Sequence, residues 1–186
     1  HIHDLDFYSL TMTCCQIDLI KLFENGFCTG DGYIREPNSI RSYASLACIA
    51  IQANQNDQHG GQSIPNFDYA MAIGVKKTYK KKLRNNILKI LSLFDETLTK
   101  EDVVELLNNV SLYEELRMCN DGFHDVLKTL LKEKYPELDM DKLYAAIMKN
   151  ALQETEEETY QAMEALIHNL NTMHSRAGAQ VPFSSL

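Results

Sequence analysis

Hydrophobic residues recur at helical spacing through most of the chain. A short helix is predicted from Asp18 to Asn25, because its apolar residues gather on one side and Gly26 suits the position after a helix end. A second helix is predicted from a cap at Ser39 to about Asn54, with apolar residues almost all round its middle. This second helix is therefore expected to be buried on most sides.

The same spacing predicts further helices towards the C-terminus. A long helix is expected after the loop 54–66, and its first half carries a run of basic residues. Shorter helices are expected to begin near Thr99, where Thr-Lys-Glu-Asp resembles a capping box, and near Asp121 and Asp139. A separate helix is predicted to open at Thr155. Helix is therefore expected to dominate the fold.

Strand-like stretches lie between these helices, at about 5–8, 11–17, 61–65 and 179–185. The loop 54–66 is dense in amides and glycine, a composition that allows close approach of the backbone and is typical of functional loops. Strands alternating with helices indicate an α/β fold that is predominantly helical.

Composition limits the classes of partner. The 186 residues are 45% hydrophobic and 24% charged, as in ordinary soluble globular proteins. With 18 basic and 26 acidic residues, the net charge of −8 argues against a nucleic-acid surface. The basic run in the long helix is then either a solvated face or a local phosphate contact. No apolar run approaches the roughly 20 residues that cross a bilayer, so we expect no membrane partner.

The cysteines indicate a reducing compartment. There are five, with no CxxC motif and no spacing typical of secreted scaffolds, which predicts reduced thiols and a cytoplasmic protein. Cys14 and Cys15 are adjacent in a strand-like stretch. Neighbouring side chains on a strand point to opposite faces, so only one of the two thiols can enter a given cavity while the other packs.

Three kinds of chemistry are open to these residues. His1, His3 and Asp4 could hold a metal together with His59, His168 or His174, as in a metal-dependent hydrolase, although the spacing matches no known ligand pattern. Cys14 could act as a nucleophile with a histidine, but no cue for a lowered thiol pKa accompanies it. A neutral thiol that donates hydrogen inside a closed cavity is the third use.

Three blocks, residues 1–19, 52–69 and 158–185, resemble the anaerobic (class III) ribonucleoside-triphosphate reductases. They include His-Ile-His-Asp-Leu-Asp near the start, Gln-His-Gly-Gly-Gln-Ser-Ile-Pro in the amide-rich loop, and Ala-Gln-Val-Pro-Phe-Ser-Ser near the end. The similarity runs from residue 1 to about 93 and from about 150 to 186, and 95–150 is interpreted as a variable helical segment. The chain starts without Met and stops in a strand-like stretch, so 1–186 is interpreted as a fragment of the catalytic domain.

The resemblance implies part of a ten-stranded α/β barrel of the glycyl radical enzyme type. Such enzymes reduce ribonucleoside triphosphates to deoxyribonucleotides without oxygen, through glycyl and thiyl radicals. It further implies an S-adenosylmethionine iron–sulfur activase, formate as reductant, deoxynucleotide and ATP effectors, and a homodimer. The ATP cone, the zinc site and the glycyl radical motif have no counterpart in these 186 residues, so the fragment is expected to be inactive alone.

The resemblance also assigns residues. Cys14 matches the barrel-strand cysteine that donates to the leaving hydroxyl, and Cys15 is taken as packing. The substrate-binding positions that it implies are His1, His3, Gln180, Ser184 and Ser185. The candidates for effector binding are Gln52, Lys81 and Arg84. A non-catalytic nucleotide-binding or dimerisation module, in which Cys14 only packs, is the alternative from another class.

Overall fold

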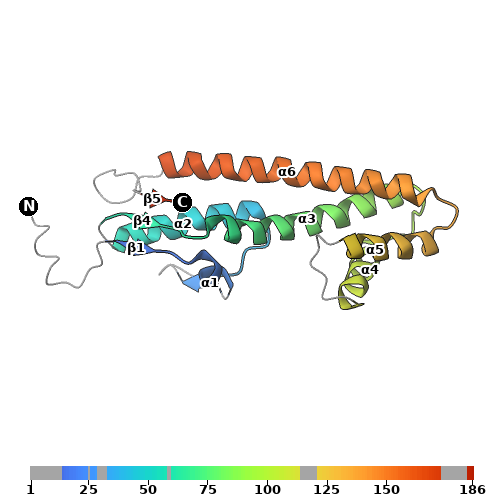
Figure 1. Cartoon of the computed structure of the whole chain (residues 1–186), viewed down its shortest axis with the longest axis horizontal. Coiled ribbons are helices and arrows are strands. Elements are labelled where there is room, and N and C mark those ends of the chain that lie inside the picture. Colours follow the sequence, from blue (N-terminus) through green and yellow to red (C-terminus); the bar gives the residue numbers. More distant parts are fainter. Residues whose placement is uncertain (1–13, 25, 29–32, 58–59, 114–120, 173–183) are drawn as a thin grey trace, which may run out of the picture. The chain divides into compact units, whose positions relative to one another are not determined.

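The computed structural model describes the chain except residues 1–13, 25, 29–32, 58–59, 114–120 and 173–183 (Figure 1). The chain divides into two compact units. The sheet unit comprises residues 1–75 and 158–186, and the helical unit comprises residues 76–157. Two long helices, α3 (Phe67–Leu91) and α6 (Met140–Thr172), pass from one unit into the other.

The sheet unit contains a small parallel sheet in the order β1-β4-β5. Its strands are β1 (Cys15–Gln16), β4 (Gln62–Ser63) and β5 (Ser184–Ser185). Parallel neighbours need long connections, and helices supply them here. The helices α1 (Leu19–Glu24) and α2 (Ile40–Asp57) lie between β1 and β4 along the chain, together with a hairpin of β2 (Phe27–Cys28) and β3 (Tyr33–Ile34).

The core of the sheet unit is built mainly from α2, with contributions from α1, α3 and α6. Ile40, Ala47 and Ile51 of α2 are fully buried, as expected for a helix that is apolar on most sides. Phe23 of α1 packs edge-on against Tyr43, with ring centroids 5.3 Å apart. The sheet itself adds Ile64, which directly follows β4 and is 2% exposed. This core therefore covers the face of the sheet that is turned towards α2.

The helical unit joins α4 (Lys100–Tyr113) and α5 (Asp121–Lys134) to the adjoining parts of α3 and α6. Leucine, isoleucine and aromatic residues at helical spacing form one continuous core. Its largest fully buried side chains are Leu83, Ile87, Leu91, Phe123, Leu127, Leu131, Met140 and Ile147. No strand occurs among the described residues of this unit.

Local sequence signals explain most helix ends. The end of α1 is followed by Gly26 with φ of 70°, and α2 begins after Ser39, whose Oγ accepts the Ser42 N–H at 3.4 Å. At α4, the N–H and O–H of Thr99 donate to Asp102 Oδ2 at 2.8 and 2.7 Å, and the Asp102 N–H donates to Thr99 Oγ1 at 3.2 Å. The predicted capping box is confirmed.

One helix prediction is wrong. Thr155 does not open a helix, because α6 runs without a break from Met140 to Thr172. Thr155 is 5% exposed in the middle of this helix, and its hydroxyl donates to the Ala151 carbonyl at 2.6 Å. A threonine that bonds back to the carbonyl four residues earlier satisfies its own polar group, so it does not need a position at a helix start. The fold is thus predominantly helical with a small parallel sheet.

Candidate functional site

One face of the small sheet carries two of the residues that sequence analysis singled out, Cys14 and Ser185. Gln16, Ser63 and Ser185 are register partners on three adjacent strands, so they form one row across the sheet. Cys14 lies at a bend directly before β1 and is exposed, as Gln16 and Ser185 are, and we infer its side by extending the alternation of β1 back to Cys14, which gives the side of Gln16. We call Cys14, Gln16, Ser63 and Ser185 the open face.

The opposite side of the same strands is covered. Its row consists of the register partners Cys15, Gln62 and Ser184. Gln62 is only 3% exposed, and its amide nitrogen donates to the Ile51 carbonyl of α2 at 3.0 Å. Side chains of this row therefore face α2. The Cys14 thiol and the hydroxyls of Ser63 and Ser185 lie on the side away from α2.

Backbone hydrogen bonds hold the three strands in this register. The Ile17 N–H donates to the Ser63 carbonyl at 2.8 Å, and the Ile64 N–H donates to the Ser185 carbonyl at 3.0 Å. The Cys15 N–H donates to the Gly61 carbonyl at 3.3 Å. These bonds bring together three short segments from the start, the middle and the end of the chain. The arrangement offers a thiol S–H donor beside amide and hydroxyl groups that can bind a polar substrate.

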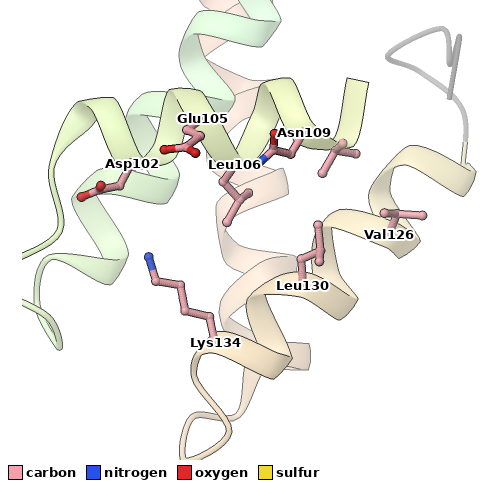
Figure 2. A pocket seen from close by; sticks show the side chains of 8 residues that line it. Asp102, Glu105, Leu106, Asn109, Val126, Leu130 and Lys134 are labelled. Carbon is pink, nitrogen blue, oxygen red and sulfur yellow. The ribbon is translucent and has the colours of Figure 1, made fainter. Parts of the chain in front are cut away.

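A second concave feature lies in the helical unit, between α4 and α5 (Figure 2). It is a groove of about 720 Å³ with an apolar floor and a polar rim. The floor consists of Leu106, Val110, Val126 and Leu130, and the rim of Asp102, Glu105, Asn109 and Lys134.

One rim residue of this groove, Asp102, is engaged in structural hydrogen bonds. Asp102 caps α4, and the hydrogen bonds from Thr99 hold the pKa of its carboxyl below the usual value. The described residues that line the groove are apolar, acidic, amide or lysine side chains, without a cysteine or histidine among them.

Among the residues with described positions, no three His, Cys, Asp or Glu side chains lie close enough to hold a metal ion. The alternative metal site rests on His1, His3, Asp4, His59 and His174, which lie outside the described residues, and on His168, which is exposed on α6. Within the described segments, no helix has the length and apolar character needed to cross a membrane.

Comparison with known proteins assigns the chain to a family. A family model described as anaerobic ribonucleoside-triphosphate reductase matches residues 1–186. This chain belongs to the anaerobic ribonucleoside-triphosphate reductase family. The chain is 38% identical over 88 residues to the anaerobic ribonucleoside-triphosphate reductase of Enterobacteria phage T4. That match covers 46% of this chain and 14% of the phage protein.

The structure brings together three of the reductase residues that the resemblance implied. Cys14, Ser184 and Ser185 lie at the same small sheet, with Ser185 on the open face and Ser184 in the row towards α2. The assignments of His1, His3 and Gln180 fall outside the described residues. All these roles remain predictions.

Sequence reasoning missed two residues of the open face, Gln16 and Ser63. The two-residue period of a strand that starts at Cys14 could have indicated Gln16. Ser63 has no comparable local signal, because only the pairing of β4 with β1 and β5 shows which face it shares.

The three candidates for effector binding do not belong to one unit. Gln52 lies half-buried on α2 of the sheet unit. Lys81 is exposed and Arg84 half-buried on the part of α3 that belongs to the helical unit. Within the described structure, the Nε atom of Arg84 is buried and has no hydrogen-bond acceptor. A buried guanidinium donor of this kind is able to bind an anion.

Proposed function

We propose that this chain is part of the catalytic subunit of an anaerobic reductase that converts ribonucleoside triphosphates to deoxyribonucleoside triphosphates. The observation that carries the proposal is the open face, where Cys14 stands beside a row of polar side chains in a chain of this family. On this proposal β1, β4 and β5 belong to a ten-stranded α/β barrel. Their parallel pairing through helical connections supports that assignment.

In the proposed reaction, Cys14 donates the proton with which the 2′-hydroxyl of the ribose leaves as water. Formate is oxidised to carbon dioxide and supplies the two electrons and the hydrogen that replace the hydroxyl. Gln16, Ser63 and Ser185 would orient the nucleotide through hydrogen bonds, together with His1, His3, Gln180 and Ser184. The radical chemistry requires a cavity without water, which the remaining strands of the barrel would enclose.

Other elements of the proposal lie outside the 186 residues. Other parts of the protein would carry the glycyl radical and the zinc site, and an S-adenosylmethionine iron–sulfur activase would generate the radical. Residues 95–150 would be a variable helical segment of the same catalytic domain. A cytoplasmic location follows from the nucleotide substrates and from the need for reduced thiols.

Effector binding is proposed at Gln52, Lys81 and Arg84, in a homodimer whose activity responds to deoxynucleotides and ATP. The buried Nε donor of Arg84 supports this assignment, because a nucleotide phosphate would supply its acceptor. Lys81 is exposed nearby on the same helix, where its charge would add to the attraction.

The test is Cys14→Ser in the complete reductase. We expect nucleotide reduction to fall to background, because a serine hydroxyl does not replace the thiol as hydrogen donor, while the glycyl radical still forms by electron paramagnetic resonance. Cys48→Ala is the matched control, since Cys48 is 2% exposed and its thiol bonds within the core, to the Leu166 carbonyl at 3.8 Å and to the Asn169 side chain. The control should keep its turnover. Reduction by Cys14→Ser at the normal rate would contradict the proposed function.

A further inference from the structure

The second thiol of the pair, Cys15, is bound by an amide rather than merely packed. Asn54, in the last turn of α2, donates from its Nδ2 to Cys15 Sγ at 2.8 Å. The same Nδ2 donates to Gln62 Oε1 at 2.7 Å. Gln62 is the register partner of Cys15 on the neighbouring strand, so one amide joins the side chains of two strands.

Gln62 is itself held in one orientation. Its Nε2 donates to the Ile51 carbonyl at 3.0 Å, and its Oε1 accepts from Asn54. With both ends of the amide engaged and the side chain 3% exposed, Gln62 has little freedom to rotate. Asn54 is therefore directed at Cys15 by a buried partner, and we call Asn54 and Gln62 the amide pair.

The position of β1 matters because Cys14 and Cys15 are adjacent. A slip of the strand by one residue moves every side chain to the other face of the sheet. Here such a slip would turn Cys14 towards α2 and place Cys15 on the open face. Since β1 has only two residues, few backbone bonds oppose that slip. In the slip that brings Gln16 to the place of Cys15, Asn54 loses its thiol partner, so the contact between Asn54 and Cys15 opposes that slip.

We propose that Asn54 and Gln62 are positioning residues: Asn54 binds the Cys15 thiol, Gln62 orients Asn54, and the pair fixes the register of β1 and thereby keeps Cys14 on the open face. The consequence for catalysis rests on the proposed function. The consequence for the two thiols does not, because it concerns only which sulfur solvent can reach.

The first readout is thiol alkylation of the complete, folded reductase, followed residue by residue by mass spectrometry. In the wild-type protein Cys14 should react fastest, Cys15 more slowly and Cys48 slowest. In Asn54→Leu, which removes the amide donor with little change in volume, Cys15 should react about tenfold faster and Cys14 more slowly. Cys48 should not change, since it lies in the core of the same unit without a bond to the amide pair.

The second readout is turnover. Asn54→Leu and Gln62→Leu should lower kcat several-fold with little change in KM, because the register of Cys14 changes while the nucleotide contacts remain. Asn171→Leu is the control, since Asn171 is exposed on the last turn of α6 in the same unit. It should change neither readout.

Three results would overturn the proposal. Unchanged alkylation of Cys15 in Asn54→Leu would show that the amide does not hold the thiol. A parallel rise at Cys48 would show general loosening of the unit. A selective rise at Cys15 with unchanged kcat would show that the register of β1 does not depend on the amide pair. A protein without reductase activity in its wild-type form would refute the proposed function instead, and the alkylation result would still decide whether the amide pair binds Cys15.

Discussion

The sheet unit and the helical unit position their side chains by different means. In the helical unit, a core of leucine, isoleucine and aromatic residues follows directly from helical spacing along α3, α4, α5 and α6. In the sheet unit, the open face depends on pairing between three strands of two residues each. The candidate catalytic residues therefore lie in the unit where strand pairing between distant segments determines which side chains are neighbours. The helical unit contains a groove whose described lining is apolar at the floor and polar at the rim.

The strongest test of this comparison is to damage each core separately. Ile51 in the sheet unit and Leu127 in the helical unit are both fully buried, at 0% exposure. Ile51→Ala and Leu127→Ala should each cost about 2–5 kcal/mol, from lost burial and the cavity left behind. Native-state hydrogen exchange should show the loss mainly in the unit that carries the substitution.

The exposed Leu93, at 78% exposure, is the control for this pair. Leu93→Ala should change stability by less than about 0.5 kcal/mol. If either core substitution accelerates exchange equally in both units, then the two units unfold as one cooperative block and the division between them has no energetic meaning.

A smaller effect is expected where two helices of the sheet unit approach closely. A Cβ atom at Gly74 of α3 would lie 2.9 Å from Cδ2 and Cγ of Tyr43 on α2, closer than atoms normally approach. Gly74→Ala should therefore destabilise the unit by about 1 kcal/mol, because overpacking of about 1–3 kcal/mol exceeds the gain of up to about 1 kcal/mol in helix propensity.

Denaturant unfolding of a double-mutant cycle measures this contact. In a Tyr43→Ala background the steric conflict is gone, so Gly74→Ala should become neutral or stabilising. A destabilisation of the same size in both backgrounds would mean that Tyr43 is not what excludes a side chain at Gly74.

The smallest effect concerns pH and the helical unit. Asp95 accepts hydrogen bonds from the Thr97 N–H and O–H and from the Tyr135 hydroxyl, at 3.0, 2.6 and 2.8 Å. These bonds hold the pKa of its carboxyl below the ordinary value of 3.8. Because the unfolded chain then binds the proton more readily, the stability from Asp95 is present above pH 3.8 and is lost as the pH falls below it.

The pKa of Tyr135 is shifted upwards, so its contribution to stability is lost at alkaline rather than acid pH. Burial, and then the bond to Asp95, raise the pKa of its hydroxyl from 10.0 to about 12. Its contribution is complete below pH 10 and is lost as the pH rises towards about 12. Urea unfolding across pH should therefore show a shallower acid limb for Asp95→Asn and a shallower alkaline limb for Tyr135→Phe. Slopes equal to those of the wild type would contradict the assigned bonds.

Helix positions could be read from the sequence because their signals are local. Ser39, Gly26 and the Thr99–Asp102 pair lie within a few residues of the ends that they define, and each does what its type predicts. Thr155 shows the limit of that reading. Its acidic neighbours resemble a helix start, but a hydroxyl bond to Ala151 lets it sit inside α6.

The candidate site was predictable only in part. Cys14 and Ser185 were assigned through the family resemblance, and the structure places both at one sheet. The sequence predicts Asn54 at the end of a helix and the start of the loop 54–66, whereas α2 extends to Asp57 and carries Asn54 within its last turn. The contact of its amide with Cys15 has no local signal, because the two residues are 39 positions apart in the chain.

The sequence by itself determined the family, the predominance of helix and the polar character of the site, because these depend on residue types and on spacing along a single segment. Only the tertiary structure shows which thiol of the pair is more exposed, that Gln16 and Ser63 form one row across the sheet, and that Asn54 binds the other thiol while it also binds Gln62. The physical reason is the range of the interactions. A helix bonds to itself, whereas a strand acquires a face only when distant segments pair with it and a helix covers one side.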